Sequence, residues 1–397
     1  MEKARFKWVL RERNRKIAAK TEVFTEQQAR RVRSFHSSFK EYSPTPLIEL
    51  TSLAQHLGIK NLFVKDESYR FGLNAFKVLG GSFAIGSYIA NELGEDIDDL
   101  PYMRLVSDEV RSLLGSKTFI TTTDGNHGRG VAWTAKQQAI VYMPQGSAAE
   151  RLANIRAEGA QAEITDMNYD DTVRYTSELA QKNGWIIVQD TAWDGYTRIP
   201  LWIMQGYMTM ALEAYEQLPV KPTHIFLQAG VGSLAGSVQG FFADIYGSSC
   251  PLTFIVEPKG ADCLYQTAAA NDGSLHSVTG RLETIMAGLA CGEPNSIAWE
   301  ILGNLSDGFI SCPDYTAAQG MRILGNPLAG DTKVSAGESG AATVGLVAEA
   351  MRDERLSDLK QALQLDENSV VLCFNTEGDT DKENYRRIVW DGAWGRE

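Results

Sequence analysis

The chain has 397 residues, of which 44% are hydrophobic and 22% charged, and 38 basic against 50 acidic side chains give a formal charge of −12. This length allows two or three domains with large apolar cores, and the moderate charge excludes a disordered chain. The acidic balance also argues against a nucleic-acid or anionic-membrane partner, because either requires clustered positive charge.

The N-terminal segment is the one basic stretch of the sequence. Residues 1–20 contain eight Lys or Arg and two Glu, so we expect a solvated helix or arm there. A transit peptide is the alternative, but Glu2, Glu12 and the scarcity of Ser argue against it. Neither an apolar signal core nor an 18-residue apolar run occurs, so we expect a cytoplasmic protein with no membrane partner.

Strands and helices alternate along most of the remaining chain. Predicted strands lie at 61–65, 118–122, 140–143, 162–165, 185–189, 223–228, 252–256 and 370–374. Predicted helices lie at about 75–90, 126–138, 148–158 and 170–182, and begin again near 233 and 341. The segment 260–340 is rich in Gly, Asn and Asp, and we expect long loops with short helices that serve a site. Such alternation is typical of mostly parallel sheets covered by helices.

A glycine-rich loop follows the strand at 223–228. It reads Gln-Ala-Gly-Val-Gly-Ser-Leu-Ala-Gly over 228–236, and glycines before a helix let free backbone N–H groups approach a phosphate. An ordinary tight turn is one alternative. Glu257, at the end of the next strand, permits a second, in which the loop and this acid hold a nicotinamide dinucleotide.

Lys77 is the candidate nucleophile. It lies in the first turn of a predicted helix beside Phe76, Val78 and Leu79, and both the helix end and apolar surroundings favour a neutral amine. A neutral lysine can form an imine with an aldehyde, although a solvated surface lysine is the ordinary interpretation. A loop of small and polar residues at 121–130 offers further anion contacts. Together, the three segments indicate a phosphate-bearing aldehyde cofactor held by lysine.

Cysteine and histidine spacing shows no metal pattern. The five Cys are widely separated, which favours free thiols in a reducing compartment, with Cys263 and Cys291 left as a conceivable disulfide. None of the five His has the i, i+4 spacing of a zinc enzyme, so we expect no metal.

Long motifs in order resemble one known family. The chain resembles the fold type II (tryptophan synthase β-like) pyridoxal-phosphate enzymes, and most closely the diaminopropionate ammonia-lyase family. The resemblance rests on motifs at 65–68, 70–77, 123–133, 142–144, 166–171, 189–193, 202–207, 286–295, 337–341 and 376–380. It implies an α/β fold of two domains, each a mostly parallel sheet flanked by helices. We expect a large domain of 1–85 and 211–397 and a small domain of 86–210.

The resemblance also implies site residues. Lys77 would hold pyridoxal 5'-phosphate as an internal aldimine, Asn126 would bond its ring hydroxyl, and Thr376 would be a neutral partner of its pyridine nitrogen. A hydroxyl partner suits elimination over transamination. Four residues of the glycine loop would hold the phosphate: Gly230, Val231, Gly232 and Ser233.

Two aspartates are candidate bases. Asp124 departs from the threonine dehydratases, whose loop has a small apolar residue at this position, and Asp190 ends the strand at 185–189, where such sheets place their sites. The resemblance implies elimination of 2,3-diaminopropionate, D or L, through an external aldimine and aminoacrylate to pyruvate and two ammonia. Reaction of both isomers needs a base on each face of the planar aldimine, so we assign Asp190 as base for the L isomer and Asp124 for the D isomer, with Lys77 as competitor. Two acids can also pair with the two amino groups of the substrate. Thr123 and Gly125 would contact the substrate.

Three alternatives remain open at this point. A threonine or serine dehydratase would retain the lysine and the phosphate loop, a nicotinamide-dependent oxidoreductase would use only the loop and Glu257, and a non-catalytic protein would bind the cofactor without turnover. A homodimer is implied by the family alone.

Overall fold

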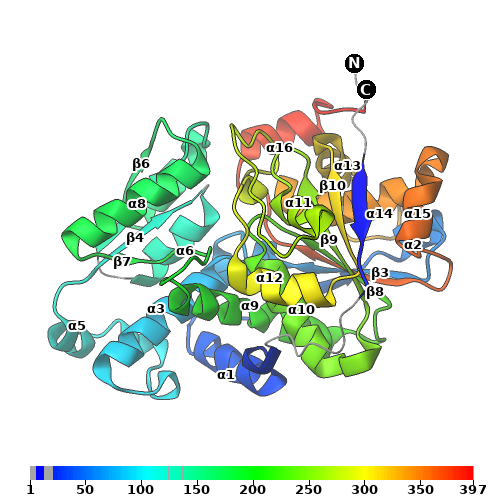
Figure 1. Ribbon diagram of the computed structural model, residues 1–397. Helices are drawn as coiled ribbons and strands as arrows, with labels where there is room; N and C mark the ends of the chain where they lie inside the picture. Colours follow the sequence, from blue (N-terminus) through cyan, green and yellow to red (C-terminus); the bar gives the residue numbers. More distant parts are fainter. Residues whose placement is uncertain (1–5, 13–20, 124, 136–137, 397) are drawn as a thin grey trace.

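Strands of the computed structural model are arranged in two separate sheets (Figure 1). The structure describes residues 6–12, 21–123, 125–135 and 138–396. The strands in these ranges are β1 Lys7–Leu10, β2 Leu47–Glu49, β3 Asn61–Asp66, β4 Thr118–Thr122, β5 Gln138–Met143, β6 Gln161–Ile164, β7 Ile186–Ile187, β8 His224–Gln228, β9 Leu252–Pro258, β10 Gly308–Cys312 and β11 Val370–Asn375. The larger sheet has the order β1-β10-β9-β8-β11-β3-β2, and the smaller has the order β6-β5-β4-β7.

Helices cover both sheets. Their bounds are α1 Glu26–Ser37, α2 Thr51–Leu57, α3 Val78–Leu93, α4 Tyr102–Leu105, α5 Asp108–Leu114, α6 Asn126–Ala135, α7 Ala149–Ala157, α8 Tyr169–Asn183, α9 Arg198–Gln217, α10 Ser233–Tyr246, α11 Cys263–Ala270, α12 Ser296–Leu305, α13 Asp314–Gly325, α14 Glu338–Arg352, α15 Ser357–Ala362 and α16 Lys382–Val389. Within the described ranges, none of these helices is long and apolar enough to cross a membrane.

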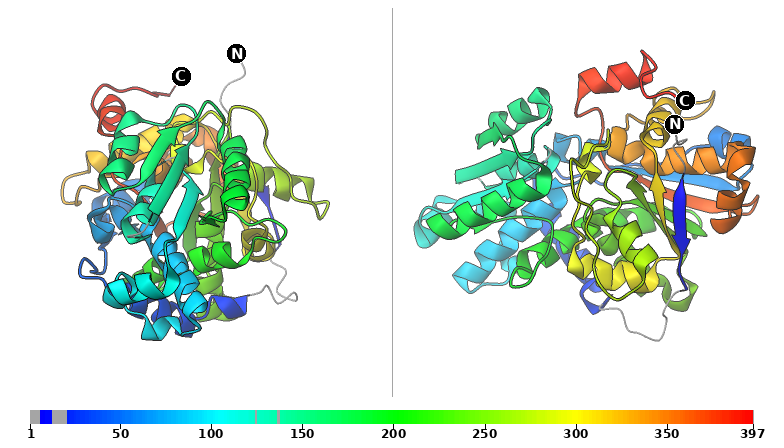
Figure 2. Two further views of the ribbon diagram at one scale, coloured as in Figure 1. Left: turned by 90° about the vertical axis from the view of Figure 1, so that its left-hand side faces the viewer. Right: turned by 45° about the horizontal axis from the view of Figure 1, so that its top comes forward.

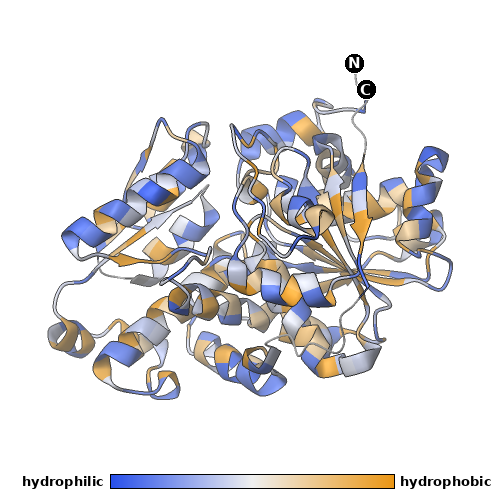
Figure 3. Cartoon of the chain, in the orientation of Figure 1, coloured by the Kyte–Doolittle hydropathy of each residue, from blue (hydrophilic) through white to orange (hydrophobic). Residues whose placement is uncertain are grey.

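The larger sheet is parallel except at its edges, where β1 and β2 pair antiparallel with β10 and β3. Successive strand residues point to opposite faces. In β11, Val370, Leu372 and Phe374 therefore join the core shared with α3, α9 and α10, whereas Val371 and Cys373 join the core shared with α13 and α14. Because both faces are buried, its central strands are almost continuously apolar, as the hydropathy colouring shows (Figure 3).

The smaller sheet is wholly parallel and lies beside the larger one, as two further views show (Figure 2). Val141 and Met143 of β5 pack with Ile155 of α7 in a small core. The α/β class with mostly parallel sheets is confirmed. The predicted domain boundaries at 85/86 and 210/211 both fall inside continuous helices, α3 and α9, and the division itself stays a prediction.

Several predicted elements differ from the observed ones. The segment 260–340 has the expected long loops, at 271–286 and 326–337, and the short helices α11, α12 and α13, but it also contains the sheet strand β10, which we did not predict. β10 has five residues, all buried, and includes Gly308 and Ser311, so it lacks the β-branched run typical of a strand. Residues 7–10 form an edge strand where we expected a helix or arm. Only residues 186–187 of the predicted strand 185–189 pair in the sheet, and part of the predicted helix to 138 lies outside the described residues.

Candidate active site

A cavity lies at the carboxyl ends of strands from both sheets. In open α/β folds, ligands bind at this edge because loops and helix N-termini meet there. Its wall is formed by Phe76, Lys77, Asn126, Asp190, Tyr207, residues 228–234, Gly288, Leu289, Cys291, Ser339, Thr376 and Glu377. Asn126 and Asp190 adjoin the smaller sheet, whereas the glycine loop and Thr376 follow β8 and β11 of the larger sheet.

Lys77 faces a carboxylate across the cavity. It is the N-cap residue of α3, and its Nζ donates to Oδ2 of Asp190 at 2.8 Å. The side chains are 13% and 6% exposed, so water screens this pair only weakly. The apolar neighbours predicted for Lys77 are therefore only part of its environment, since a buried carboxylate attracts its ammonium. Lys77 can therefore become a neutral amine only when a proton leaves the Lys77–Asp190 pair.

Asp190 is anchored through both its carboxylate and its backbone. Burial alone would raise the pKa of its carboxyl, but the positive charges of Lys77 and His127 outweigh this and lower the pKa to about 2. Its carbonyl oxygen accepts from the hydroxyl of Ser233 and from Nδ2 of Asn295, the latter at 3.1 Å. Asp190 is therefore an ionised carboxylate, and its backbone is bound to the glycine loop.

The glycine loop leads directly into α10. Gly232 is the N-cap residue with φ of +100°, a conformation that residues with a side chain rarely adopt. A Cβ at Gly230 would lie 3.2 Å from Cα of Leu289 and from Sγ of Cys291. The first turn of a helix has no internal partners for its N–H groups, so the loop presents donors and a positive helix end to the cavity.

Two further contacts position polar groups in the cavity. Nδ2 of Asn126 donates to Oε2 of Glu377 at 2.6 Å, and Nε2 of Gln228 donates to Oγ1 of Thr376 at 2.9 Å. Because Gln228 ends β8 and Thr376 follows β11, parallel pairing of these strands places the two side chains together.

The cavity wall fits a polar ligand with an anionic group. The hydroxyls of Tyr207 and Ser339 and Oε1 of Gln228 are buried without a hydrogen-bond partner among the described residues. Leaving such atoms unpaired costs about 1–3 kcal/mol each, so a ligand that bonds to them stabilises the site. With an amine at Lys77 and the glycine cradle, these groups suit a phosphate-bearing aldehyde.

The structure brings most of the predicted site residues together. Lys77, Asn126, Asp190, Thr376 and the loop 230–233 all line the cavity.

The residues on either side of position 124, Thr123 and Gly125, are not among the residues of this cavity wall. Thr123 is buried and accepts from the backbone N–H of Gly125 at 2.9 Å, and it does not contribute to the described cavity wall. Gly125 lines a neighbouring cavity that shares Asn126. Asp124 lies outside the described residues.

Sequence reasoning missed five polar residues of the site: Tyr207, Gln228, Asn295, Ser339 and Glu377. Four of them stand in the motifs that carry the family resemblance, and Gln228 begins the glycine loop, so their positions were visible but their roles were not. A role depends on contacts such as that of Asn126 with Glu377, 251 residues apart.

Glu257 has a different role from the one a dinucleotide would require. Its carboxylate is fully buried and accepts from the backbone N–H groups of Leu264 and Tyr265 at 2.8 and 2.7 Å, in the first turn of α11. Burial raises the pKa of Glu257 well above its usual value. The acid thus caps a helix and is not among the residues of the cavity wall, which removes the support for a nicotinamide site.

The described residues contain no cluster of His, Cys, Asp and Glu able to hold a metal ion, and all five cysteines are free thiols.

The fold and the lysine site define a class of enzyme. A family model described as pyridoxal-phosphate dependent enzyme matches residues 39–376, and the chain belongs to that family. Its arrangement is that of the fold type II members.

Within this family the chain belongs with the diaminopropionate ammonia-lyases. The diaminopropionate ammonia-lyase of Salmonella typhimurium is 52% identical over 369 residues, 91% of each chain. The crystal structure of the Escherichia coli diaminopropionate ammonia lyase in complex with an aminoacrylate-PLP azomethine reaction intermediate has a TM-score of 0.90 and 47% identity, covering 99% of both chains. A catabolic L-threonine dehydratase of Staphylococcus aureus is 26% identical over 285 residues, 70% of this chain and 71% of its own.

Proposed function

We propose that this protein catalyses the pyridoxal-phosphate-dependent elimination of 2,3-diaminopropionate to pyruvate and two molecules of ammonia. The observation that carries the proposal is 52% identity to a diaminopropionate ammonia-lyase over nine-tenths of both chains, against 26% to a threonine dehydratase. The buried carboxylate of Asp190 in the cavity wall agrees with a substrate that carries two amino groups, one more than serine or threonine.

The cavity residues divide into roles toward the cofactor. Lys77 would supply the amine that binds its aldehyde, Asn126 would contact its ring hydroxyl and Thr376 would contact its pyridine nitrogen. The phosphate is assigned to the loop Gly230, Val231, Gly232 and Ser233. When bound, pyridoxal phosphate delocalises the negative charge that develops as the α-proton leaves the substrate.

Asp190 controls the proton of Lys77. In the pair observed at 2.8 Å, the carboxylate is ionised and Lys77 is its cation. When Nζ of Lys77 gives up its proton, the carboxylate loses the neighbouring charge that lowers its pKa, and its basicity rises. The same oxygen can then bind a substrate ammonium or accept a proton.

The two substrate enantiomers present their α-protons on opposite faces of the bound substrate. An enzyme that acts on both isomers therefore requires one base on each face. We assign Asp190 to the L isomer and Asp124 to the D isomer, with Lys77 as the competing base or as the proton donor to the leaving amine. Thr123 and Gly125 border the loop that carries Asp124, and we assign them to substrate contact.

A coupled pyruvate assay over D- and L-diaminopropionate, serine and threonine tests the proposal. We expect kcat/KM to be highest for diaminopropionate, and preference for threonine or serine would instead identify a dehydratase. Asp190→Asn should lower kcat/KM about 10²–10⁴-fold for the L isomer and less for the D isomer, and Asp124→Asn should do the reverse. Equal losses on both isomers would overturn the division of roles.

We further propose that the protein is a cytoplasmic homodimer. Five free cysteines agree with a reducing compartment, and a mass by light scattering of twice the 43.7 kDa chain tests the dimer.

A further inference from the structure

Glu377 is a buried carboxylate of the cavity that the proposed chemistry leaves without a role. It follows β11 and Thr376 and is 2% exposed. Its Oε2 accepts from Nδ2 of Asn126 at 2.6 Å, and its Oε1 accepts from the backbone N–H of Ser339 at 3.1 Å. The acid therefore joins the first residue of α6, beside the smaller sheet, to the start of α14 on the larger one.

The backbone around Glu377 is held on two sides. Its carbonyl accepts from the N–H of Gly337 at 2.9 Å, and the N–H of Gly378 donates to the carbonyl of Asn74 at 3.0 Å. A Cβ at Gly337 would lie 2.9 Å from Cγ of Glu377, so the glycine allows α14 to begin against this side chain. The segment that carries Lys77 and the start of α14 thus both fix the position of the carboxylate.

The contact also determines which way the Asn126 amide points. Both carboxylate oxygens of Glu377 act as acceptors, one from Asn126 and one from Ser339, so the NH₂ group of Asn126 faces Glu377. The start of α14 stabilises the negative charge, because Ser339 N–H lies in its first turn and the positive helix end is there. One N–H of the Asn126 amide then donates to Glu377. Because the amide group is planar, the same contact also fixes the direction of its second N–H.

We propose that Glu377 is a positioning residue that holds the Asn126 amide in the orientation in which it meets the cofactor's ring hydroxyl. The inference rests on the proposed assignment of Asn126. The carboxylate acts through Asn126, and its charge also favours the protonated form of the bound chromophore.

A double-mutant cycle on cofactor affinity tests this role. We expect Glu377→Gln to weaken the binding of pyridoxal phosphate to the cofactor-stripped protein about tenfold, the scale of one bond to a charged group. Asn126→Ala should weaken binding as well, and the double variant N126A/E377Q should be no weaker than N126A alone. Additive losses in the double variant would show that Glu377 does not act through Asn126.

The visible absorbance of the bound cofactor supplies a second readout that a purely structural role would not move. We expect its pH titration to shift to lower pH in E377Q, since a negative charge is lost. Glu338→Gln is the matched control: Glu338 is the neighbouring buried acid on α14, and its Oε1 accepts from Asn384. An equal shift in E338Q would overturn the proposal.

A shortened side chain separates folding from positioning. If E377Q does not fold, Glu377→Asp keeps the charge but withdraws it from Asn126 by about 1.5 Å, one C–C bond, and should also weaken cofactor binding about tenfold. Wild-type affinity in this variant would contradict the proposal. Neither the cofactor affinity nor the absorbance titration needs an amino acid substrate. Both can therefore test the role of Glu377 even if the protein does not turn over diaminopropionate.

Discussion

At the scale of single residues, burial shifts the protonation of Glu338, the chain neighbour of Ser339 in the cavity wall. Glu338, the first residue of α14, is 3% exposed and accepts from Nδ2 of Asn384. Burial and the nearby charge of Glu377 raise its pKa to about 7, although Arg151, 3.9 Å away, opposes this. In the unfolded chain this carboxyl titrates near its ordinary value of about 4.3.

This raised pKa predicts a loss of stability as pH increases. Between about pH 4.3 and 7 the folded state keeps a proton that the unfolded state has lost, so the free energy of unfolding falls as pH rises through this window. Glu338→Gln keeps the Asn384 contact and removes the titration. We expect the variant to gain stability relative to the wild type between pH 5 and pH 8, as measured by urea unfolding at both values. A constant difference at the two pH values would contradict the assignment.

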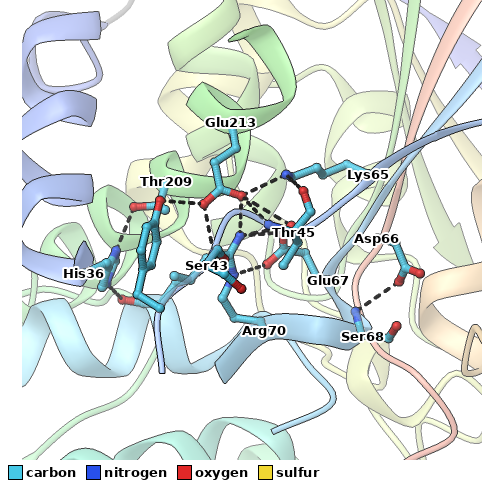
Figure 4. Close-up of polar contacts among 12 residues, drawn as sticks. His36, Ser43, Thr45, Lys65, Asp66, Glu67, Ser68, Arg70, Thr209 and Glu213 are labelled. Carbon is cyan, nitrogen blue, oxygen red and sulfur yellow. Dashed lines mark hydrogen bonds and ion pairs between the residues drawn. The ribbon is translucent and has the colours of Figure 1, made fainter. Parts of the chain in front are cut away.

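At the scale of secondary-structure elements, a buried ion network joins β3 to α9 (Figure 4). Nζ of Lys65 on β3 lies 2.8 Å from Oε2 of Glu213 on α9, and Arg70 contacts both Glu213 and Glu67 at 2.7 and 2.8 Å. All four side chains are at most 1% exposed, and their formal charges cancel. The network secures the segment that leads from β3 to Lys77.

Glu213 and Glu216 form a matched pair on α9 for measuring this network. Glu213→Gln removes the charge that balances Lys65 and Arg70, and we expect a loss of about 3–5 kcal/mol in the free energy of unfolding. Glu216 pairs with Arg30 and Arg33 at the surface, where it is 35% exposed, so Glu216→Gln should cost less than about 1 kcal/mol. If Glu213→Gln lowered the free energy of unfolding as little as Glu216→Gln, the buried network would contribute little to stability.

At the scale of the whole molecule, the cavity wall belongs to both sheets. Asn126 and Asp190 come from segments next to the smaller sheet, and the phosphate loop and Thr376 from the larger one. A ligand that contacts both parts binds only the folded arrangement and stabilises it by mass action.

Thermal unfolding with matched ligands tests this coupling. Pyridoxal phosphate at about a hundred times its Kd should add about 2.7 kcal/mol to the stability of the cofactor-stripped protein and raise its Tm. Pyridoxal at the same concentration lacks the phosphate assigned to the loop 230–233 and should raise Tm less. Equal shifts would argue against that loop as the phosphate site.

Local patterns in the sequence were sufficient to predict the alternation of strands and helices, because hydrophobic periodicity and glycine turns are local properties. They also placed Lys77, Asn126 and the glycine loop at strand ends, which is where parallel sheets gather their sites. The strand β10 was not predicted, since full burial of Gly308–Cys312 comes from neighbouring strands and not from local pattern.

The partners of these residues are set by the tertiary structure and could not be read from the sequence. The carboxylate beside Lys77 comes from 113 residues further along the chain, and the carboxylate beside Asn126 from 251 residues further. The tertiary structure also showed that Glu257 caps a helix, where its spacing alone allowed a ribose contact. Protonation and orientation depend on such distant charges and on burial, and neither quantity is encoded in local spacing.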